Sequence, residues 1–287
     1  MAAPRTTAPS WPDYQLLDAG GGKKLERWGK IITIRPEVQA YFHSGKPFTE
    51  WRELAHWEFI DVPGKSGRWK ALKAEAPAMW QVSFGRLKFN IGTSTFKHVG
   101  LFPEQAANWE HIDQHLQAEH KFLNLFAYTG AASCVARLKG ADTFHVDASK
   151  SILNWGRENM DASRLLNIHW VLEDALKFAE REARRGNKYD YIIMDPPAWG
   201  NGPKGEKWKL EDKIDQLFAA TAQILNPSGL LTLNTYSPSI EASMLSELAA
   251  IYFEGRPVEQ SGLFIESQTG KALYCGELLR IGALSLQ

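Results

Sequence analysis

Four short apolar runs after residue 120 are followed by residues that could bind a ligand or act on one. These residues are Gly130, Asp147, the pair Glu173-Asp174, and Asp195. In an open parallel sheet, ligands bind at the carboxyl ends of the strands, near the point where the strand order reverses. If the four runs are parallel strands, we therefore expect these features to lie at one edge of the sheet.

The segment Asp195-Pro196-Pro197-Ala198-Trp199 follows the most apolar of the four runs. Two prolines directly after a buried strand favour a stiff, extended exit, which would hold the Asp195 carboxylate above the sheet. Trp199, two residues further on, could stack on a planar acceptor such as a nucleobase. The alternative interpretation is a rigid loop with a structural tryptophan.

The run from Asn124 to Gly130 must turn sharply from a strand into a helix. Gly130 would let the backbone approach a ligand closely, beside the free amides of the helix N-terminus. A plain strand-to-helix turn is the structural alternative. The dinucleotide-binding pattern G-x-G-x-x-G is missing from this turn, which disfavours an NAD enzyme.

The acidic residues at the next two strand ends also have two interpretations each. Asp147 comes 17 residues after Gly130 and could accept hydrogen bonds from both ribose hydroxyls. It could instead cap the helix that begins near residue 149. Glu173-Asp174 could accept a hydrogen bond from the exocyclic amine of adenine, whereas Asp174 could simply cap the following helix.

The elements that must position these residues alternate regularly after residue 120. Apolar runs predict strands at 122–126, 143–147, 169–172, 189–194 and 230–234. Helical patterns lie between and after these strands. The first follows Gly130 and ends at residue 138, and the others cover 150–160, 175–185, 210–225 and 242–253. This alternation predicts a parallel sheet covered on both faces. Two final runs, 258–264 and 272–281, predict an antiparallel hairpin at the sheet edge.

The first third of the chain has a different texture. Residues 14–18 and 31–35 and the segment 80–91 predict strands, and 47–57 has one apolar helical face. We therefore expect a flexible tail over residues 1–12, a small β-rich accessory domain over 13–95, and a larger α/β domain over 96–287.

Composition excludes several classes of protein. Hydrophobic residues make up 44% of 287 residues, enough for a real core, and no apolar window is long enough to predict a membrane span. The N-terminus has no apolar segment of a secretory signal, and the cysteines, Cys134 and Cys275, predict no disulfide framework, so we expect a cytoplasmic setting. A net charge of zero argues against a chain that coats nucleic acid over its whole surface, but allows a local basic patch.

The segments NLFAYTG, HVDASK, EDALKF, IIMDPPAWGNGPKG and LLTLNTYS resemble the successive motifs of class I S-adenosylmethionine-dependent methyltransferases. They are most similar to a bacterial family related to the large-subunit ribosomal RNA cytosine methyltransferases. The resemblance covers about residues 96–282, including the upstream segment HVGLFPEQAANW. It implies a Rossmann-like, seven-stranded sheet with an antiparallel last strand, S-adenosyl-L-methionine as cofactor and RNA as partner. The cofactor contacts that it implies are Phe102, Gln105, Phe126, Thr129, Gly130, Asp147, Ala148, Asp174 and Asp195.

The chain departs from that family where a nucleophile is expected. Methylation of a pyrimidine at carbon 5 needs a thiolate that first adds to the ring. The places where the RNA cytosine enzymes carry this cysteine read Asn234-Thr-Tyr-Ser237 and Ala198-Trp-Gly-Asn201 here. We therefore expect an acceptor atom with its own lone pair. We place Asp195, which directly precedes Pro196-Pro197, and Asn234 nearest to this acceptor. Two alternatives to an RNA methyltransferase stay open. One is a methyltransferase that acts on a small molecule or a protein side chain, and the other is a nucleotide-binding regulatory module without catalysis.

A basic segment in the accessory domain could hold the RNA. Residues 63–98 contain seven lysines and arginines but only one acid, with Trp69, Trp80 and Phe89 interleaved. On a strand, Arg86 and Lys88 would share one face, where they could neutralise phosphates. The alternative is a solvated strand face whose aromatic side chains lie in the core.

Two further features remain open or are set aside. Residues 202–213 mix both signs of charge and could form a lid over the site or only a surface loop. His111 and His115, four residues apart, lack a third ligand, so we interpret them as a solvated helix face and expect no metal.

Overall fold

The computed structural model describes residues 4–62, 65–201 and 205–282, and the chain forms two compact units. The first unit takes residues 1–6, 108–263 and 276–287, and the second takes 7–107 and 264–275. The second unit therefore includes residues 96–107 and 264–275, which we expected in the larger domain. Residues 264–275 belong to it although they continue two strands of the first unit. No local signal in the sequence marks such an exchange.

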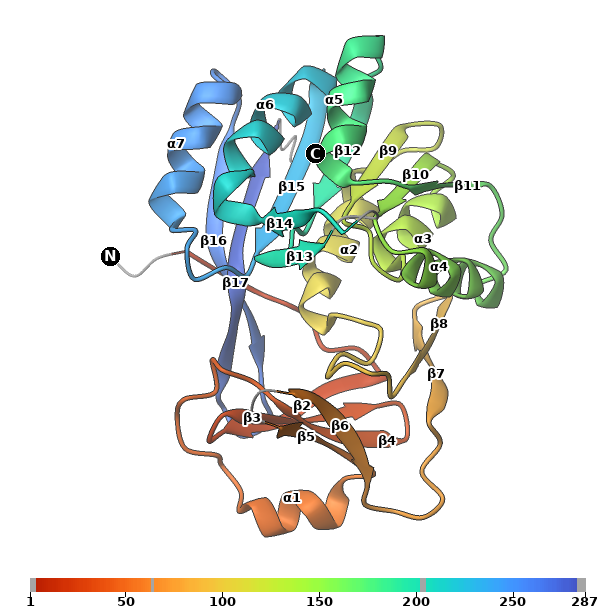
Figure 1. Ribbon diagram of the computed structural model, residues 1–287, viewed down its shortest axis with the longest axis vertical. Helices are drawn as coiled ribbons and strands as arrows, with labels where there is room; N and C mark the ends of the chain where they lie inside the picture. The colour runs from red at the N-terminus through yellow and green to blue at the C-terminus, as the bar shows by residue number, and fades with distance from the viewer. Residues whose placement is uncertain (1–3, 63–64, 202–204, 283–287) are drawn as a thin grey trace. The chain divides into compact units, whose positions relative to one another are not determined.

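The first unit is built on an eight-stranded sheet in the order β1-β16-β17-β15-β12-β9-β10-β11 (Figure 1). Its strands are β1 (Arg5–Thr7), β9 (Lys121–Leu125), β10 (Asp142–Asp147), β11 (Ile168–Leu172), β12 (Tyr189–Met194), β15 (Leu225–Thr235), β16 (Val258–Glu266) and β17 (Ala272–Ile281). Strands β9 to β12 and β15 are parallel, and β17 is antiparallel to β15. The predicted α/β fold class and antiparallel closing strand are therefore confirmed.

The eighth strand is β1, at the edge of the sheet where the sequence predicts a flexible tail. The backbone nitrogen of Gly262 donates to the Pro4 carbonyl oxygen over 3.0 Å, and the hydroxyl oxygens of Thr6 and Ser261 lie 2.7 Å apart. The seven predicted strands thus gain a short partner beside β16. This segment is polar, which suits an edge strand because one side of such a strand is open to water.

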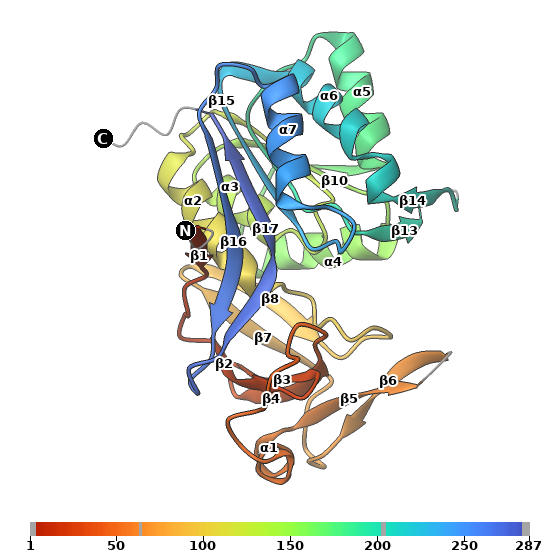
Figure 2. The same cartoon turned by 90° about the vertical axis from the view of Figure 1, so that its left-hand side faces the viewer.

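Helices cover both faces of this sheet, with α5, α6 and α7 on one face and α3 and α4 on the other (Figure 2). The helix bounds are α2 (Ala106–His115), α3 (Ala131–Leu138), α4 (Lys150–Ala162), α5 (Ala175–Arg185), α6 (Ile214–Ile224) and α7 (Ala242–Tyr252). Ile192 and Met194 of β12 pack with Phe178 and Phe218 in the buried core under α5–α7. Along the described part of the chain, no helix is long and apolar enough to cross a membrane.

Two boundaries differ from the sequence prediction around α6. A 3-10 turn occupies Leu210–Asp212, so α6 begins at Ile214 instead of residue 210. Strand β15 begins at Leu225 instead of residue 230 and includes the Asn226-Pro227 pair. The register between β12 and β15 shifts after the Tyr189–Leu225 pair, which leaves Pro227 in an irregular stretch of the strand. A proline is tolerated there because its missing N–H breaks no regular ladder bond.

The second unit contains a five-stranded sheet and a separate hairpin. The sheet order is β2 (Tyr14–Gly20), β3 (Lys23–Trp28), β4 (Ile31–Pro36), β5 (Trp57–Val62) and β6 (Lys65–Ala71); the other elements are α1 (Phe48–Leu54), the hairpin β7 (Met79–Phe84) and β8 (Leu87–Gly92), and a 3-10 turn at Pro103–Gln105. The β-rich character is confirmed, although β3, β5 and β6 were not expected. Their alternating charged and apolar residues give only short, weak runs.

A buried carboxylate, Asp18, ties three segments of the second unit together. Its oxygens accept hydrogen bonds from the backbone nitrogens of Gly45 and Lys46, from Trp51 Nε1 and from Thr269 Oγ1, at 2.6–3.1 Å. Burial alone would raise the pKa of Asp18, but these four hydrogen bonds outweigh burial and lower it below its usual value. Asp18 thus joins residues 264–275 to the rest of this unit.

We predict that Asp18→Asn destabilises the protein by on the order of 3 kcal/mol at neutral pH, because hydrogen bonds to a buried charge are lost. The folded pKa is lowered, so the advantage of wild type should persist above pH about 5 and shrink as the pH falls through the unfolded and then the folded pKa. Urea unfolding between pH 7 and pH about 3 measures this difference. Asp61→Asn, at an exposed position of β5, is the control, and an equal loss there would contradict the role of Asp18.

Candidate functional site

The predicted ligand-binding features come together at the carboxyl ends of adjacent strands. Strand β9 pairs with β10 on one side and with β12 on the other, and β10 pairs with β11. The chain order reverses between β9 and β12, so this is the switch point of the sheet, where open α/β sheets bind ligands. The residues that follow these four strands therefore share one edge of the first unit.

The turn between β9 and α3 has an uncommon backbone. Phe126, Tyr128 and Gly130 have φ angles of 58°, 51° and 85°. Non-glycine residues with positive φ cost energy and cluster at ligand sites. A Cβ atom at Gly130 would lie 3.3 Å from Cε1 of His145, so glycine also keeps this turn close to β10.

Asp147 holds the β9–α3 turn to the turn that follows β10. One carboxylate oxygen accepts from the Tyr128 backbone nitrogen over 3.0 Å, and the other accepts from the Ser149 backbone nitrogen over 2.9 Å. Burial raises the pKa of Asp147, while the amides of Ser149, Tyr128 and Ala148 act in the opposite direction. A carboxylate has about four acceptor sites, so these three amides leave capacity that a ribose hydroxyl could use.

A buried polar chain supports the glycine turn from below, and the sequence interpretation missed it. Asn124 Nδ2 donates to Ser133 Oγ over 3.0 Å, and Ser133 Oγ lies 3.0 Å from His145 Nδ1. Asn159 Nδ2 also donates to the Thr129 carbonyl oxygen over 2.9 Å. All these side chains are buried, and burial lowers the pKa of His145 to about 3, so its ring is neutral. Single polar residues within apolar runs were the only available signal.

The two acids after β11 have structural partners. Asp174 caps α5, because its carboxylate accepts from the Lys177 backbone nitrogen over 3.0 Å, and Glu173 forms an ion pair with Arg181. The capping interpretation of Asp174 is therefore confirmed. The contact between Asp174 and adenine stays a prediction.

The exit from β12 is held by a hairpin that the sequence did not predict. Strands β13 (Trp199–Asn201) and β14 (Lys207–Lys209) pair antiparallel. Of the segment 202–213, in which the sequence allows a lid or a surface loop, residues 207–209 form this strand and 210–212 form a 3-10 turn. Residues 202–204 lie outside the described residues. Trp208 Nε1 donates to the Pro197 carbonyl oxygen over 2.7 Å, and its ring lies 4.9 Å from that of Phe126. Trp208 thus links the Asp195-Pro-Pro exit to the glycine turn.

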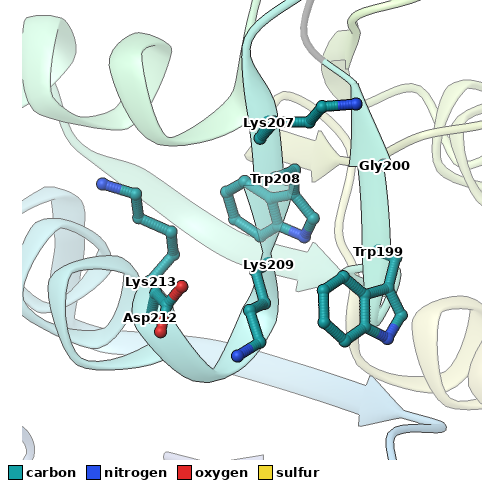
Figure 3. A pocket seen from close by; sticks show the side chains of 7 residues that line it. All are labelled: Trp199, Gly200, Lys207, Trp208, Lys209, Asp212 and Lys213. Carbon is teal, nitrogen blue, oxygen red and sulfur yellow. The ribbon is translucent and has the colours of Figure 1, made fainter.

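The two faces of this hairpin differ. Trp208 is buried, whereas Trp199 is 66% exposed. A pocket of about 540 Å³ lies here, which we call the Trp199 pocket (Figure 3). Its lining consists of Trp199, Gly200, Lys207, Trp208, Lys209, Asp212 and Lys213.

The remaining predicted site residues lie in varied surroundings. Asp195 and Ala148 are half-buried at the ends of β12 and β10. Asn234 is buried, and its Nδ2 donates to the Glu277 carbonyl oxygen over 2.9 Å, so its amide nitrogen supports the neighbouring strand. Phe102 and Gln105 belong to the second unit.

The interpretation of the α2 histidines as a solvated face is wrong for His111. This side chain is buried, and its Nδ1 lies 2.6 Å from the Tyr191 hydroxyl. Burial, with the nearby Arg280, lowers the pKa of His111 to about 3. Within residues 4–62, 65–201 and 205–282, no cluster of three or more His, Cys, Asp or Glu side chains could hold a metal ion.

Comparison with known proteins identifies the family. A family model described as S-adenosylmethionine-dependent methyltransferase matches residues 61–256. The chain belongs to this family. The crystal structure of a SAM-dependent methyltransferase from Agrobacterium tumefaciens is similar to it with a TM-score of 0.92 and 34% identity, over 98% of this chain and 94% of that one. The predicted class I methyltransferase fold, enzyme class and cofactor are confirmed.

Curated relatives match a smaller part of their own length. The ribosomal RNA large subunit methyltransferase K/L of Pseudoalteromonas translucida is 34% identical over 50% of this chain and 20% of the relative. The protein of the same name from Chromohalobacter salexigens is 30% identical over 71% of this chain and 25% of the relative. The chain thus spans a quarter or less of the length of these relatives.

The residues at the sheet edge fit S-adenosylmethionine. Gly130 would let the cofactor approach the backbone, and the Asp147 carboxylate has acceptor capacity left for a ribose. The positive φ angles of Phe126 and Tyr128 cost conformational energy, as is typical of backbone at a ligand-binding site.

We predict that Asp147→Ala weakens S-adenosylmethionine binding at least about tenfold, because hydrogen bonds to a carboxylate contribute about 1.5–3 kcal/mol each. Calorimetric titration with the cofactor measures the effect. Asp142→Ala, at the opposite end of the same strand, is the matched control and should bind normally. A folded Asp147→Ala protein with unchanged affinity would remove Asp147 from the site.

Proposed function

We propose that this chain methylates RNA, with ribosomal RNA favoured, at an acceptor atom that has its own lone pair and without a covalent cysteine intermediate. The observation that carries this proposal is the rigid Asp195-Pro196-Pro197 exit, which Trp208 links to the cofactor turn at Phe126. Such an exit suits the positioning of a planar acceptor. The names of the curated relatives support RNA as the substrate class.

The chemistry asks for positioning and for removal of a proton. S-adenosylmethionine supplies an electrophilic methyl group on its sulfonium sulfur. The acceptor lone pair must lie in line with the bond that breaks, and holding it there supplies much of the acceleration. The prolines fix the backbone that carries Asp195, whose carboxylate would accept a hydrogen bond from the acceptor and help it lose a proton. Asn234 would stand behind this group, with its amide nitrogen anchored on Glu277.

Neither cysteine is suited to act as a nucleophile. Cys134 is fully buried in α3, and burial raises the pKa of its thiol to about 12. Burial also raises the pKa of Cys275, in β17, well above its usual value. The thiolate is the reactive form of cysteine, so both thiols are inert at neutral pH.

We predict that Cys134→Ser and Cys275→Ser keep turnover within a few-fold of wild type, apart from a modest loss of stability at these sites. Asp195→Ala should lower kcat by about 100-fold or more while cofactor affinity falls much less, as expected for a general base. Single-turnover methylation and calorimetry separate the two effects. A folded Cys275→Ser protein that binds cofactor but does not transfer methyl would revive covalent catalysis.

The basic segment of the second unit is the RNA-binding surface in this proposal. Arg68, Lys70 and Lys88 are exposed on β6 and β8, and exposed Arg86 lies in the two-residue turn between β7 and β8. The expectation that Arg86 and Lys88 share a strand face is therefore wrong, although both reach solvent at one end of the hairpin. The aromatic part also changes, because Phe89 is fully buried and belongs to the core.

We predict that Arg86→Glu with Lys88→Glu weakens RNA binding and reduces its dependence on salt, while S-adenosylmethionine binds as in wild type. Each phosphate that the protein no longer neutralises should lower the slope of log affinity against log salt by about 0.7–0.9. The measurement is RNA affinity from 50 to about 200 mM salt. Lys30→Glu, in the turn of another hairpin of the same unit, is the control for Arg86→Glu. Methylation of sub-saturating RNA at the wild-type rate by the double variant would exclude this surface.

The substrate class itself is tested by incubating the protein with radiolabelled cofactor and separate cell fractions of RNA, protein and small metabolites. We expect the label in RNA. Label in protein or in metabolites alone would instead support the alternative substrate classes. We place this activity in the cytoplasm, where two free cysteines would stay reduced.

A further inference from the structure

The outward face of the β13–β14 hairpin combines an exposed indole with lysines. Trp199 pairs in register with Lys209, and Asn201 pairs with Lys207. Because paired residues share a face and successive residues alternate, Trp199, Lys207 and Lys209 lie on one face while Trp208 lies on the other. Figure 3 shows these side chains along the two strands.

The hairpin is anchored to the Asp195-Pro-Pro exit at two points. Trp208 Nε1 donates to the Pro197 carbonyl oxygen, and the Leu210 backbone nitrogen donates to the Ala198 carbonyl oxygen over 3.0 Å. Trp208 and Leu210 are both buried. The outward face of the hairpin is therefore presented by a fixed frame directly beyond the expected acceptor site.

Trp199 is held in place without being covered. Lys209 Nζ lies 5.2 Å from the centre of the indole, and Lys209 also forms an ion pair with Glu211. A cation over one face orients the ring. With 66% of its surface exposed, Trp199 still offers ring area for stacking.

The charge of the Trp199 pocket favours an anionic ligand. Three lysines, Lys207, Lys209 and Lys213, line it against a single acid, Asp212. Lys209 is paired with Glu211, so the positive charge of the pocket rests on Lys207 and Lys213. Lysines beside a stacking aromatic are the pairing that holds single-stranded nucleic acid, since phosphates meet the cations and an unpaired base meets the ring. A base within a duplex is already stacked and cannot use an indole in this way.

We propose that the Trp199 pocket binds single-stranded RNA, with one base stacked on Trp199 and neighbouring phosphates of the strand held by Lys207 and Lys213. This inference rests on the proposed RNA substrate and adds to it a second contact region, on the first unit. Stacking of an RNA base on Trp199 would also make the enzyme selective for unpaired RNA.

The test uses the full chain and a fluorescein-labelled, mixed-sequence oligoribonucleotide of about 12 nucleotides, within the usual span of single-strand sites. Fluorescence anisotropy gives its affinity as a single strand and as a duplex. Trp199→Ala should bind the single strand about tenfold more weakly, whereas Trp199→Phe keeps a stacking ring and should stay within about threefold. Duplex binding should not change in either variant.

The lysines are tested by Lys207→Glu with Lys213→Glu. This pair should weaken single-strand binding and lower the salt slope by about 0.7 for each phosphate that is no longer neutralised. Lys121→Glu with Arg184→Glu carries the same charge change at exposed positions at the amino-terminal edge of the sheet, and should bind nearly as wild type. Unchanged thermal unfolding and cofactor affinity show that each variant is folded.

Two results would overturn the inference. One is wild-type affinity for the single strand in folded Trp199→Ala, and the other is an equal loss of affinity in the control pair, which would indicate only general attraction. The labelled cell fractions are read separately. If wild type methylates RNA but Trp199→Ala binds normally, the pocket assignment fails alone; if wild type labels no RNA, the proposed function fails.

Discussion

The Asp147 carboxylate is the interaction on which the proposed cofactor site depends. Its two oxygens bind backbone amides from two different turns, at Tyr128 after β9 and at Ser149 after β10. The first turn holds Phe126 and Tyr128 at positive φ, a conformation that a free loop would leave. Asp147, Gly130 and the buried Asn124–Ser133–His145 chain together keep this conformation, so the proposed binding turn is held without a ligand. Preformed sites avoid the cost of ordering a loop on binding.

The acceptor side depends on the cofactor side through Trp208. One indole both contacts Phe126 and binds the Pro197 carbonyl oxygen, so movement of either segment would disturb the other. The prolines stiffen the chain that carries Asp195, and the β13–β14 hairpin extends the same frame to Trp199. If this sheet edge binds the cofactor as we propose, the same frame also fixes the direction from which an acceptor approaches.

Sequence reasoning predicted the elements with strong periodicity and missed those formed by pairing alone. Strand β12 and helix α5 were predicted with their observed bounds, because a long apolar run and a clear helical face are local signals. Strand β1 and the β13–β14 hairpin have short polar sequences, and only their hydrogen-bond partners make them strands. At the site, Asp147 and Gly130 stood out by spacing, but Trp208 did not, since nothing local distinguishes it from a core tryptophan. His111 was misjudged because its partner, Tyr191, lies 80 residues away.

Methyl transfer to RNA at an atom with a lone pair is the step that most needs a direct measurement. That measurement is mass spectrometry of nucleosides from ribosomal RNA that has been incubated with the purified protein and isotopically labelled S-adenosylmethionine, then digested completely. We expect a single labelled nucleoside with its methyl group on nitrogen or oxygen, absent when Asp195→Ala replaces wild type. A labelled 5-methylcytidine would contradict the proposed chemistry, because that product requires the cysteine nucleophile for which neither thiol is suited.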